Sequence, residues 1–331
     1  MSKNPGRIWY LNAEIVARRD GTLILIGREI FRIYPANSTL HGVLRHLSRG
    51  INEAEYSSIK AVTSANRLFT ELEKRGLMTS MLSKTDNPTL EKSAIFYSRM
   101  QRKRADTIEH LGMKTVTILG CGGVGAGVAL HLCGAGIRNF NLLDYDDISV
   151  SNLNRQYPYR PDQIGQPKTE VLAHHLNALS ADGVISTEQV RVTSRDNLQK
   201  ISDQPCDLIV GALDTPPLEI RLAMLDIAIE KNLPIIFGAA GYADVTVGPL
   251  LTSQSAMKSY RTHLVNQISG VDLLSLAPVQ GSLPGINSMV TSMIANIAIS
   301  FLAELSLSNV MNEEILLDAW NFEIKARRTY D

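Results

Sequence analysis

Apolar and polar residues alternate along the first part of the chain in a pattern that predicts a small sheet. Residues 8–18 alternate loosely, and two apolar runs, residues 21–26 and 29–34, follow on either side of Gly27. Such alternation is typical of strands that bury one face. We expect the three runs to form one small antiparallel sheet.

The next apolar positions repeat at helical spacing. Residues 40–49 and 61–75 each place apolar side chains on one face, and Gly76 stands where the second helix would end. Strands followed by helices indicate a small α+β, winged-helix-like module over residues 1–80. The polar stretch 81–94, which contains a proline, is the expected linker.

From residue 95 onward, short apolar runs alternate with helical patterns. The runs 115–119, 139–143 and 207–213 have the length and composition of buried strands, and an apolar helix is expected over about 285–305. Strands that alternate with helices are typical of α/β folds. We predict the α/β class, with a Rossmann-like mixed sheet over residues 95–331.

A glycine-rich turn joins the strand 115–119 to a helix that begins near Val124. Its sequence is Gly120-Cys121-Gly122-Gly123-Val124-Gly125. Glycine lets the backbone turn tightly and approach a phosphate, while free N–H groups and the positive helix end attract the anion. Tight packing of the strand on the helix is the structural alternative. We predict a nucleotide-binding turn made by Gly120, Gly122, Gly123 and Gly125.

An acidic residue stands at the end of the second strand. Asp144 follows residues 139–143, at the position where a carboxylate accepts hydrogen bonds from the ribose hydroxyls of a nucleotide. Asp147 is its rival, and a turn-capping role for Asp144 is the alternative. An NAD-dependent oxidoreductase fits these features equally well.

The polar residues that follow favour a triphosphate. Ser151, Asn152, Arg155 and Gln156 have no obvious purpose in a dehydrogenase, whereas arginine and asparagine facing phosphates would have one. Lys168 begins the next helix, where a cation opposes the helix dipole unless an anion is nearby. We therefore expect a phosphate ligand beside Lys168. The alternatives are a solvated turn around Asn152 and a surface lysine.

Taken in order along the chain, these motifs resemble those of the ThiF/MoeB superfamily of ATP-dependent carboxylate-adenylating enzymes, which includes the ubiquitin-activating enzymes. The resemblance covers roughly residues 95–330. It implies that ATP is the nucleotide and that the chain is an enzyme. It also implies contacts with the nucleotide loop, the ribose or the phosphates for Gly122, Asp144, Asn152, Arg155 and Lys168.

Two further charged residues gain roles from the same resemblance. Asp214 follows the strand 207–213 and matches a magnesium-binding aspartate, although it could instead cap the helix after it. Tyr97-Ser98-Arg99-Met100 is similar to a motif whose arginine crosses a homodimer into the partner's ATP site. Arg99 in a solvated basic helix face is the alternative. With Mg²⁺, the catalytic residues Arg99, Arg155, Lys168 and Asp214 would stabilise charge that builds in phosphoryl transfer.

The three cysteines narrow the choice of reaction. Cys121, Cys133 and Cys206 occupy positions where cysteine acts as a small hydrophobe, and no two form a C-x-x-C pair. A tetrathiolate zinc site of the kind common in the superfamily cannot be built, so no zinc site is expected. The segment 252–280, where ubiquitin-type activators carry a thioester cysteine, contains none. Transfer to a protein thiol is therefore not expected.

Length and composition agree with an enzyme of two domains in the cytoplasm. The 331 residues, 44% of them hydrophobic, can bury a large core. Residues 1–5 do not resemble a secretory signal. Polar residues interrupt the apolar helix near 285–305, which favours a buried core or dimer helix over a membrane span.

The zero net charge is unevenly divided. Residues 1–110 hold 18 Lys and Arg against 11 Asp and Glu, an excess of +7 that the remainder balances with −7. The basic half has no lysine-rich tract or aromatic interleaving typical of nucleic-acid binding. An acidic peptide is the better partner.

The pattern of residues 29–34, 40–44 and 68–77 is similar to the leader-binding modules of ribosomal peptide maturation enzymes, which add a leader peptide as an extra strand. Joined to a ThiF-like domain, it resembles the peptide-modifying branch of the superfamily. A pantocin-type member would activate glutamate side chains and close a fused ring in a peptide antibiotic. A dimerisation or DNA-binding winged helix is the alternative for the module.

Two later segments are expected near the substrate. Small residues at 238–241, followed by Tyr242 and Asp244, would leave room for a peptide, although a plain hairpin is an alternative. Residues 252–280 are interpreted as a mobile crossover over the substrate, with His263 as a possible base or a surface residue. We expect an ATP-dependent peptide-modifying enzyme. The alternatives are a sulfur-carrier or ubiquitin-like protein adenylyltransferase and an NAD-dependent oxidoreductase.

Overall fold

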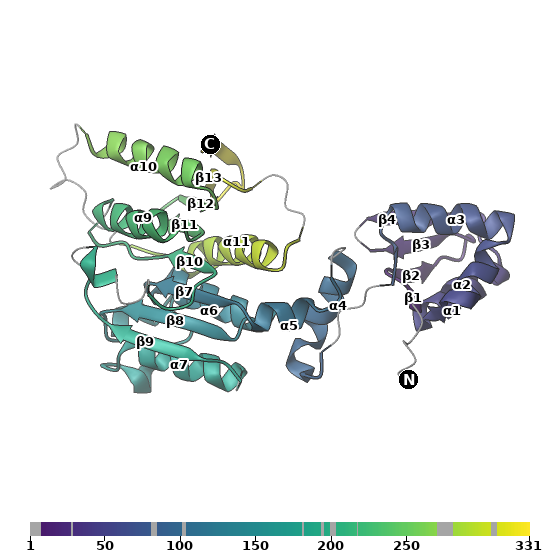
Figure 1. The fold of residues 1–331 in the computed structure, drawn as a ribbon, viewed down its shortest axis with the longest axis horizontal. Helices are drawn as coiled ribbons and strands as arrows, with labels where there is room; N and C mark the ends of the chain where they lie inside the picture. The colour runs from purple at the N-terminus through teal and green to yellow at the C-terminus, as the bar shows by residue number, and fades with distance from the viewer. Residues whose placement is uncertain are drawn as a thin grey trace. The chain divides into compact units, whose positions relative to one another are not determined.

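The computed structural model describes residues 8–27, 29–80, 85–100, 104–180, 182–192, 195–198, 203–216, 218–269, 281–305 and 310–331. Contacts divide the chain into two compact units, Met1–Ile108 and Glu109–Asp331. Figure 1 shows the helices and strands of both units, and each unit is described by itself.

Two small antiparallel sheets form the first unit, where the sequence predicts one. One sheet has the order β2-β3-β4 and the other the order β5-β1-β6. The run 8–18 breaks into two strands because Asn12 turns its side chain to the carbonyl oxygens of Gly76 and Arg99, at 3.0 and 3.2 Å. Their bounds are β1 Ile8–Leu11, β2 Glu14–Ala17, β3 Leu23–Ile26, β4 Ile30–Ile33, β5 Ile51–Asn52 and β6 Met78–Thr79.

Three helices pack on these strands, one more than the periodicity predicts. They are α1 (Ser38–Arg49), α2 (Glu53–Lys60) and α3 (Thr63–Lys74). Helix α2 is short and weakly amphipathic, but Asn52 and Glu55 cap it reciprocally. Gly76 ends α3 as expected, with a φ of 66°, a left-handed conformation that glycine adopts without strain. The linker region adds α4 (Glu91–Met100).

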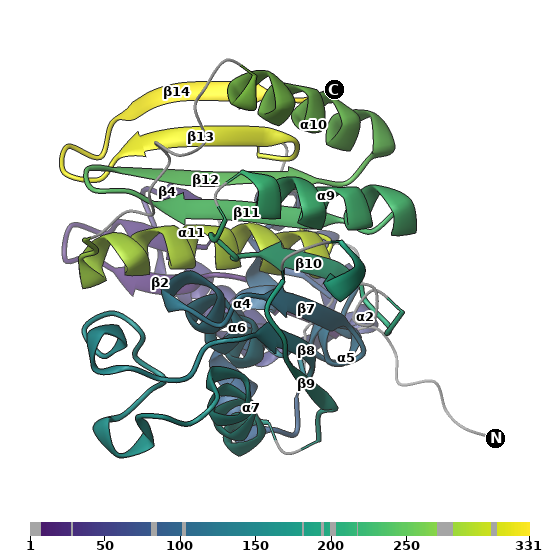
Figure 2. The same ribbon diagram turned by 90° about the vertical axis from the view of Figure 1, so that its left-hand side faces the viewer.

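An eight-stranded mixed sheet runs through the second unit, as predicted. Figure 2 shows its strands in the order β14-β13-β12-β11-β10-β7-β8-β9. The five strands from β11 to β9 are parallel, and β12 to β14 add antiparallel strands beside β11. The bounds are β7 Thr115–Leu119, β8 Asn139–Asp144, β9 Ile185–Gln189, β10 Leu208–Gly211, β11 Ile235–Ala240, β12 Asp244–Leu251, β13 Glu313–Asp318 and β14 Ile324–Thr329.

Helices cover both faces of this sheet (Figure 1). Helices α6 and α11 pack against each other, and α9 packs against α10. Gly127 of α6 permits the first contact, because a Cβ there would lie 2.6 Å from Thr291. The bounds are α5 Thr107–Gly112, α6 Gly123–Ala135, α7 Lys168–Leu179, α9 Glu219–Lys231, α10 Gln254–Ile268 and α11 Pro284–Leu302.

Helix α11 is the apolar helix expected near 285–305. Its length and mean hydropathy of 1.4 would allow it to cross a membrane by composition alone. Nine of its side chains are nevertheless buried, and it packs on α6, β11 and β12. This packing is that of a core helix, in agreement with the sequence interpretation.

The segment 252–280 differs from its predicted form. Residues 254–268 form α10, whose first turn Ser253 caps by accepting the Ala256 N–H. Tyr260 anchors the helix in the core with no exposed surface. The interpretation as a mobile crossover is therefore wrong for this part, and residues 270–280 lie outside the described residues.

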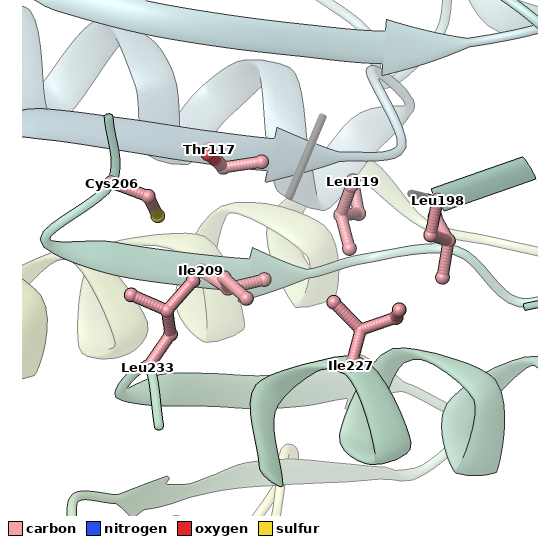
Figure 3. Close-up of a pocket in the computed structure, with 7 residues that line it drawn as sticks. All are labelled: Thr117, Leu119, Leu198, Cys206, Ile209, Ile227 and Leu233. Atoms are coloured by element: carbon pink, nitrogen blue, oxygen red, sulfur yellow. The ribbon is translucent and has the colours of Figure 1, made fainter. Parts of the chain in front are cut away.

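A small apolar cavity lies beneath the sheet, between β7, β10 and α9. Figure 3 shows its lining, in which the side chains of Ile209, Leu233 and Ile227 surround a space of about 10 Å³. That volume holds about one water molecule, and the walls offer almost no polar partner. The cavity is thus a packing gap in the core.

Candidate functional site

A cavity of about 530 Å³ opens at the carboxyl ends of the central parallel strands. Crevices at this edge of an open α/β sheet are where such folds bind ligands. Eight of the ten residues selected from the sequence line it, and Gly125 and Arg99 do not. The eight are Gly120, Gly122, Gly123, Asp144, Asn152, Arg155, Lys168 and Asp214.

The glycines of the turn differ in what they do. Gly120 has a φ of 101° and passes so close to Ala212 that a Cβ would lie 2.7 Å from its carbonyl. Gly125 presses on the Gly120 carbonyl, where a Cβ would lie 1.9 Å away. These two positions therefore fit the packing alternative.

Gly122 faces open space. A Cβ there would meet only the Gln156 amide, at 3.8 Å. Gly122 is the N-cap of α6, and within the part of the chain that the structure describes no side-chain cap satisfies the start of this helix. The turn therefore presents backbone donors and a positive helix end to the cavity.

Asp144 holds the glycine turn as well as lining the cavity. Its Oδ2 accepts the Cys121 N–H at 2.6 Å, and its Oδ1 accepts the Asp146 N–H at 2.9 Å. Burial raises the pKa of this carboxyl, while the hydrogen bonds and Lys168 oppose that rise. Each oxygen keeps a second lone pair that can accept a ribose hydroxyl.

Lys168 already has an anionic partner within the protein. Its Nζ lies 2.6 Å from Asp146 Oδ2, and its side chain is only 4% exposed. The sequence argument used an external anion to explain a lysine at a helix start, but Asp146 supplies an anion within the protein. The position of Lys168 therefore does not by itself indicate a phosphate, and a phosphate ligand beside it stays a prediction. Asp146 was not selected from the sequence, since its carboxylate meets Lys168 only in the folded chain.

The loop before α7 is built by its own side chains. Asn152 Oδ1 accepts the Ser149 N–H at 3.0 Å, so this asparagine caps a turn, as the alternative interpretation expects. Arg155 Nη1 donates to the Ser151 carbonyl at 2.8 Å and to Asn154 Oδ1 at 3.0 Å. Both residues still line the cavity, and the guanidinium of Arg155 has donors left for a phosphate.

Asp214 is an exposed cavity residue and caps no helix. Helix α9 begins at Glu219, with Leu218 as its N-cap residue and no side-chain cap. Asp214 Oδ1 accepts only the Thr215 hydroxyl, at 3.0 Å, among the bonds described. Its carboxylate is therefore available to a cation, and the helix-cap alternative is wrong.

Arg99 belongs to the first unit and is engaged there. It lies near the end of α4, and its Nη1 is 3.1 Å from Glu14 Oε1. Both side chains are partly exposed, so this ion pair is weak and exchangeable.

Two cavity neighbours were not selected as site residues. Gln156 lines the cavity, is 4% exposed, and leaves its Oε1 without a partner within the described residues. Tyr159 is buried behind the turn and donates to the Cys121 carbonyl at 2.6 Å. The only signal for either residue is its place in the polar run after Asn152.

Arg221 is a third such neighbour. It lines the cavity from α9, donates to the Tyr260 hydroxyl at 3.0 Å and lies over the Phe237 ring at 5.2 Å. Helical position in α9 gives no hint of this role, because the aromatic partners come from β11 and α10.

Of the residues expected near the substrate at 238–244, only some line the cavity. Gly238, Ala239 and Ala240 line the cavity within β11, and the hairpin alternative also holds because β11 pairs with β12. Asp244 Oδ1 lies 2.5 Å from Lys325 Nζ, so this carboxylate already forms an ion pair within the protein.

His263 lies on α10 and not on a loop. The Nη1 of Arg328 is 2.7 Å from its Nε2. Burial, followed by the Arg328 charge, lowers the pKa of the imidazole. It is not among the residues that line the cavity.

The cavity suits a nucleotide–magnesium complex better than a bare ion. Among the described residues, no group of three or more His, Cys, Asp or Glu side chains could hold a metal ion. Magnesium, however, is usually bound by one or two carboxylates together with substrate phosphates. Asp214 fits that role by its exposed carboxylate.

Fold and cavity together define a Rossmann-like α/β protein whose cavity lies where such folds bind nucleotides. The chain belongs to the ThiF family, whose model matches residues 97–331. The predicted family is thus confirmed over the second unit, and ATP-dependent activation of a carboxylate stays a prediction.

The curated relatives match only part of this chain. The chain is 34% identical over 131 residues to the sulfur carrier protein adenylyltransferase of Thermus thermophilus. The matched stretch covers 40% of this chain and 47% of that relative. It is 32% identical over 130 residues to the adenylyltransferase and sulfurtransferase MOCS3 of Aedes aegypti. This match covers 39% of this chain and 29% of that relative. The match therefore spans less than half of each relative.

Solved structures match along almost the whole chain. Escherichia coli MccB with ATP has a TM-score of 0.78 at 18% identity, covering 98% of this chain and 97% of that one. The microcin C7 biosynthetic enzyme MccB in complex with N-formylated MccA gives 0.78 at 17% identity, with the same coverage. PaaA has a TM-score of 0.69 at 18% sequence identity, and the match covers 96% of this chain and 98% of that one. This likeness confirms the predicted fold of both units.

Proposed function

We propose that this enzyme uses ATP to activate a carboxylate of a ribosomally made precursor peptide. The observation that carries the proposal is the meeting of Asp144, Arg155, Lys168 and Asp214 in one cavity beside the open start of α6. The family of the second unit and the fold shared with MccB, whose structures include ATP and MccA complexes, support it.

The chemistry is the transfer of an adenylyl group from ATP to a carboxylate. A carboxylate oxygen of the peptide attacks the α-phosphorus of ATP, the bond to the bridging oxygen of the β-phosphate breaks, and pyrophosphate leaves. The product is an acyl adenylate, a mixed anhydride open to attack by a nearby nitrogen or carbon nucleophile.

The side chains act on charge and position. Arg155, Lys168 and the N–H groups after Gly122 would neutralise the phosphate oxygens as charge builds in the transition state. Asp144 would hold the ribose. Asp214 would hold Mg²⁺, which when bound screens the repulsion between the carboxylate and the triphosphate.

No protein thiol takes part in this scheme. Cys121 and Cys133 are buried and Cys206 is partly buried. Burial raises the pKa of all three thiols, that of Cys133 to about 11. A buried neutral thiol is a poor nucleophile, so the activated carbonyl would pass directly to its acceptor.

The first unit would hold the leader of the precursor. The order β2-β3-β4 leaves β4 at one edge, where among the described residues it pairs only with β3. Ile30 and Tyr34 on and beside this strand are 57% and 72% exposed. Unpaired backbone groups flanked by exposed apolar side chains suit an added peptide strand, and the positive charge of this half favours an acidic leader.

Finer features of the reaction belong to the same proposal. Glutamate side chains would be the activated groups and a fused ring the product, as in pantocin-type enzymes. The protein would act as a homodimer in which Arg99 of one protomer completes the ATP site of the other.

The decisive test combines the protein, Mg-ATP and the short acidic peptide encoded nearest its gene. We expect the peptide to lose one or more waters, with AMP and pyrophosphate appearing, when peptide mass and nucleotide are measured together. Asp214→Asn protein is the control and should leave both unchanged. Intact peptide and intact ATP with the wild-type protein would refute the proposal.

A sulfur-carrier adenylyltransferase is the second candidate, favoured by the 34% identity to the Thermus thermophilus protein. It predicts adenylation of a small protein that ends in Gly-Gly, read as a mass increase of one AMP. Adenylation of such a protein without any change in the peptide would favour this candidate.

A further inference from the structure

Tyr145 lines the cavity next to the predicted ribose residue but has no part in the chemistry proposed above. It follows Asp144 directly at the carboxyl end of β8, and its side chain is not buried, since the residue is 37% exposed. The surroundings of the ring are polar. Aromatic side chains commonly line ligand pockets, and a ring at this cavity wall offers a flat apolar face to a bound molecule.

Arg191 holds this ring from one side. Its guanidinium carbon lies 5.1 Å from the centre of the Tyr145 ring, in a cation–π contact. Residue Gln189, at the end of β9, pairs with Asp144 in the sheet and donates to Asp147 Oδ1 at 3.0 Å and to the Tyr145 carbonyl at 3.5 Å. The side chain of Tyr145 thus contacts Arg191, just beyond β9, and its backbone contacts Gln189 at the end of β9.

We propose that Tyr145, backed by Arg191, is the stacking platform for the purine base of the bound nucleotide. The inference rests on the proposed function, because Asp144 must hold the ribose of that nucleotide. The base is bonded to the ribose, so the residue adjacent to the ribose carboxylate is within reach of its flat face. The phosphates would meet Arg155 and Lys168, which line the same cavity.

The polar groups around the tyrosine hydroxyl agree with a role for the ring and not for the oxygen. The Asp146 carboxylate is the main cause that raises the pKa of Tyr145, which therefore stays neutral. A neutral aromatic face stacks on any base, since every base has a π-face. The platform should therefore add affinity for the nucleotide more than discrimination between purines.

The test separates the base from the phosphates. Titration calorimetry measures Mg-ATP and Mg-tripolyphosphate, which lacks base and ribose, on wild type, Tyr145→Ala and Tyr145→Phe. Tyr157→Ala is the matched control, because Tyr157 is a 66% exposed tyrosine outside the cavity lining. Circular dichroism melting of each variant checks that it is folded.

We expect Tyr145→Ala to weaken Mg-ATP binding about tenfold, or about 1.4 kcal/mol, with tripolyphosphate affinity unchanged. Tyr145→Phe and Tyr157→Ala should bind both ligands as wild type does. Equal ATP affinity in Tyr145→Ala, or an equal loss for tripolyphosphate, would overturn the platform while leaving the adenylation proposal intact. Wild-type protein that binds tripolyphosphate but gains nothing from adenosine would overturn both.

Discussion

The Nζ of Lys168 lies 2.6 Å from Oδ2 of Asp146, and the two residues meet from the start of α7 and the loop after β8. The lysine side chain is 4% exposed and the aspartate side chain 42%. This ion pair satisfies the lysine at a helix start, where the helix dipole disfavours a cation.

The unequal burial of the pair predicts unequal costs of removing each partner. Asp146→Ala leaves a buried, unpaired ammonium and should lower the free energy of unfolding by about 3 kcal/mol. Lys168→Ala leaves an exposed carboxylate and should cost less, about 1 kcal/mol. Urea unfolding measures both. The double variant should be more stable than Asp146→Ala alone, and equal losses in the two single variants would contradict this account.

Lys168→Ala should nevertheless be the more harmful change for turnover. Loss of one electrostatic donor to the phosphates is expected to lower kcat by on the order of a hundredfold, measured as pyrophosphate release with the precursor peptide. Lys231→Ala removes a lysine paired with Asp203 outside the cavity lining and is the control. Turnover unchanged by Lys168→Ala would remove this residue from the site.

Asp214→Asn tests the metal assignment. The change keeps size and removes the charge, so magnesium-dependent ATP cleavage should be abolished while the fold is retained, because Asp214 is exposed and caps no helix. Asp162→Asn, at an exposed acidic residue outside the cavity lining, should cleave ATP normally. Normal turnover in Asp214→Asn would show that the cation is held elsewhere.

Mixed dimers can test the proposal that Arg99 of one protomer completes the ATP site of the other. Protomers with Arg99→Ala mixed with Asp214→Asn protomers should recover partial activity, since one of the two sites would then be complete. Glu14→Gln is the matched control, because it breaks the 3.1 Å ion pair and keeps the arginine. We expect full activity from Glu14→Gln, and demonstrated heterodimers without recovered activity would count against the placement.

Thiol chemistry offers a fifth test. Burial raises the pKa of Cys121, Cys133 and Cys206, so little thiolate is present at pH 8. Turnover should survive iodoacetamide at that pH, with alkylation counted by intact mass. Inactivation in step with alkylation of one cysteine would instead support a thioester intermediate.

Local sequence was sufficient to predict the elements that carry the nucleotide turn. The strand 115–119 was predicted with its observed bounds, and the helix after it begins at Gly123, one residue before the predicted start. Such features follow from periodicity and from glycine's freedom at a positive φ, which act over a few residues.

Tertiary structure decided what the polar residues near that turn do. Asn152 caps its own turn, and Asp146 pairs with Lys168 across 22 positions of sequence. Asn12 divides the first predicted strand by bonding to carbonyls 64 and 87 residues away. A polar side chain can satisfy its hydrogen bonds with many partners, so its sequence position alone does not choose among them. The sequence by itself determined the order of strands, helices and glycine turns, and only the folded chain determined which charges and donors face the cavity and which are already paired.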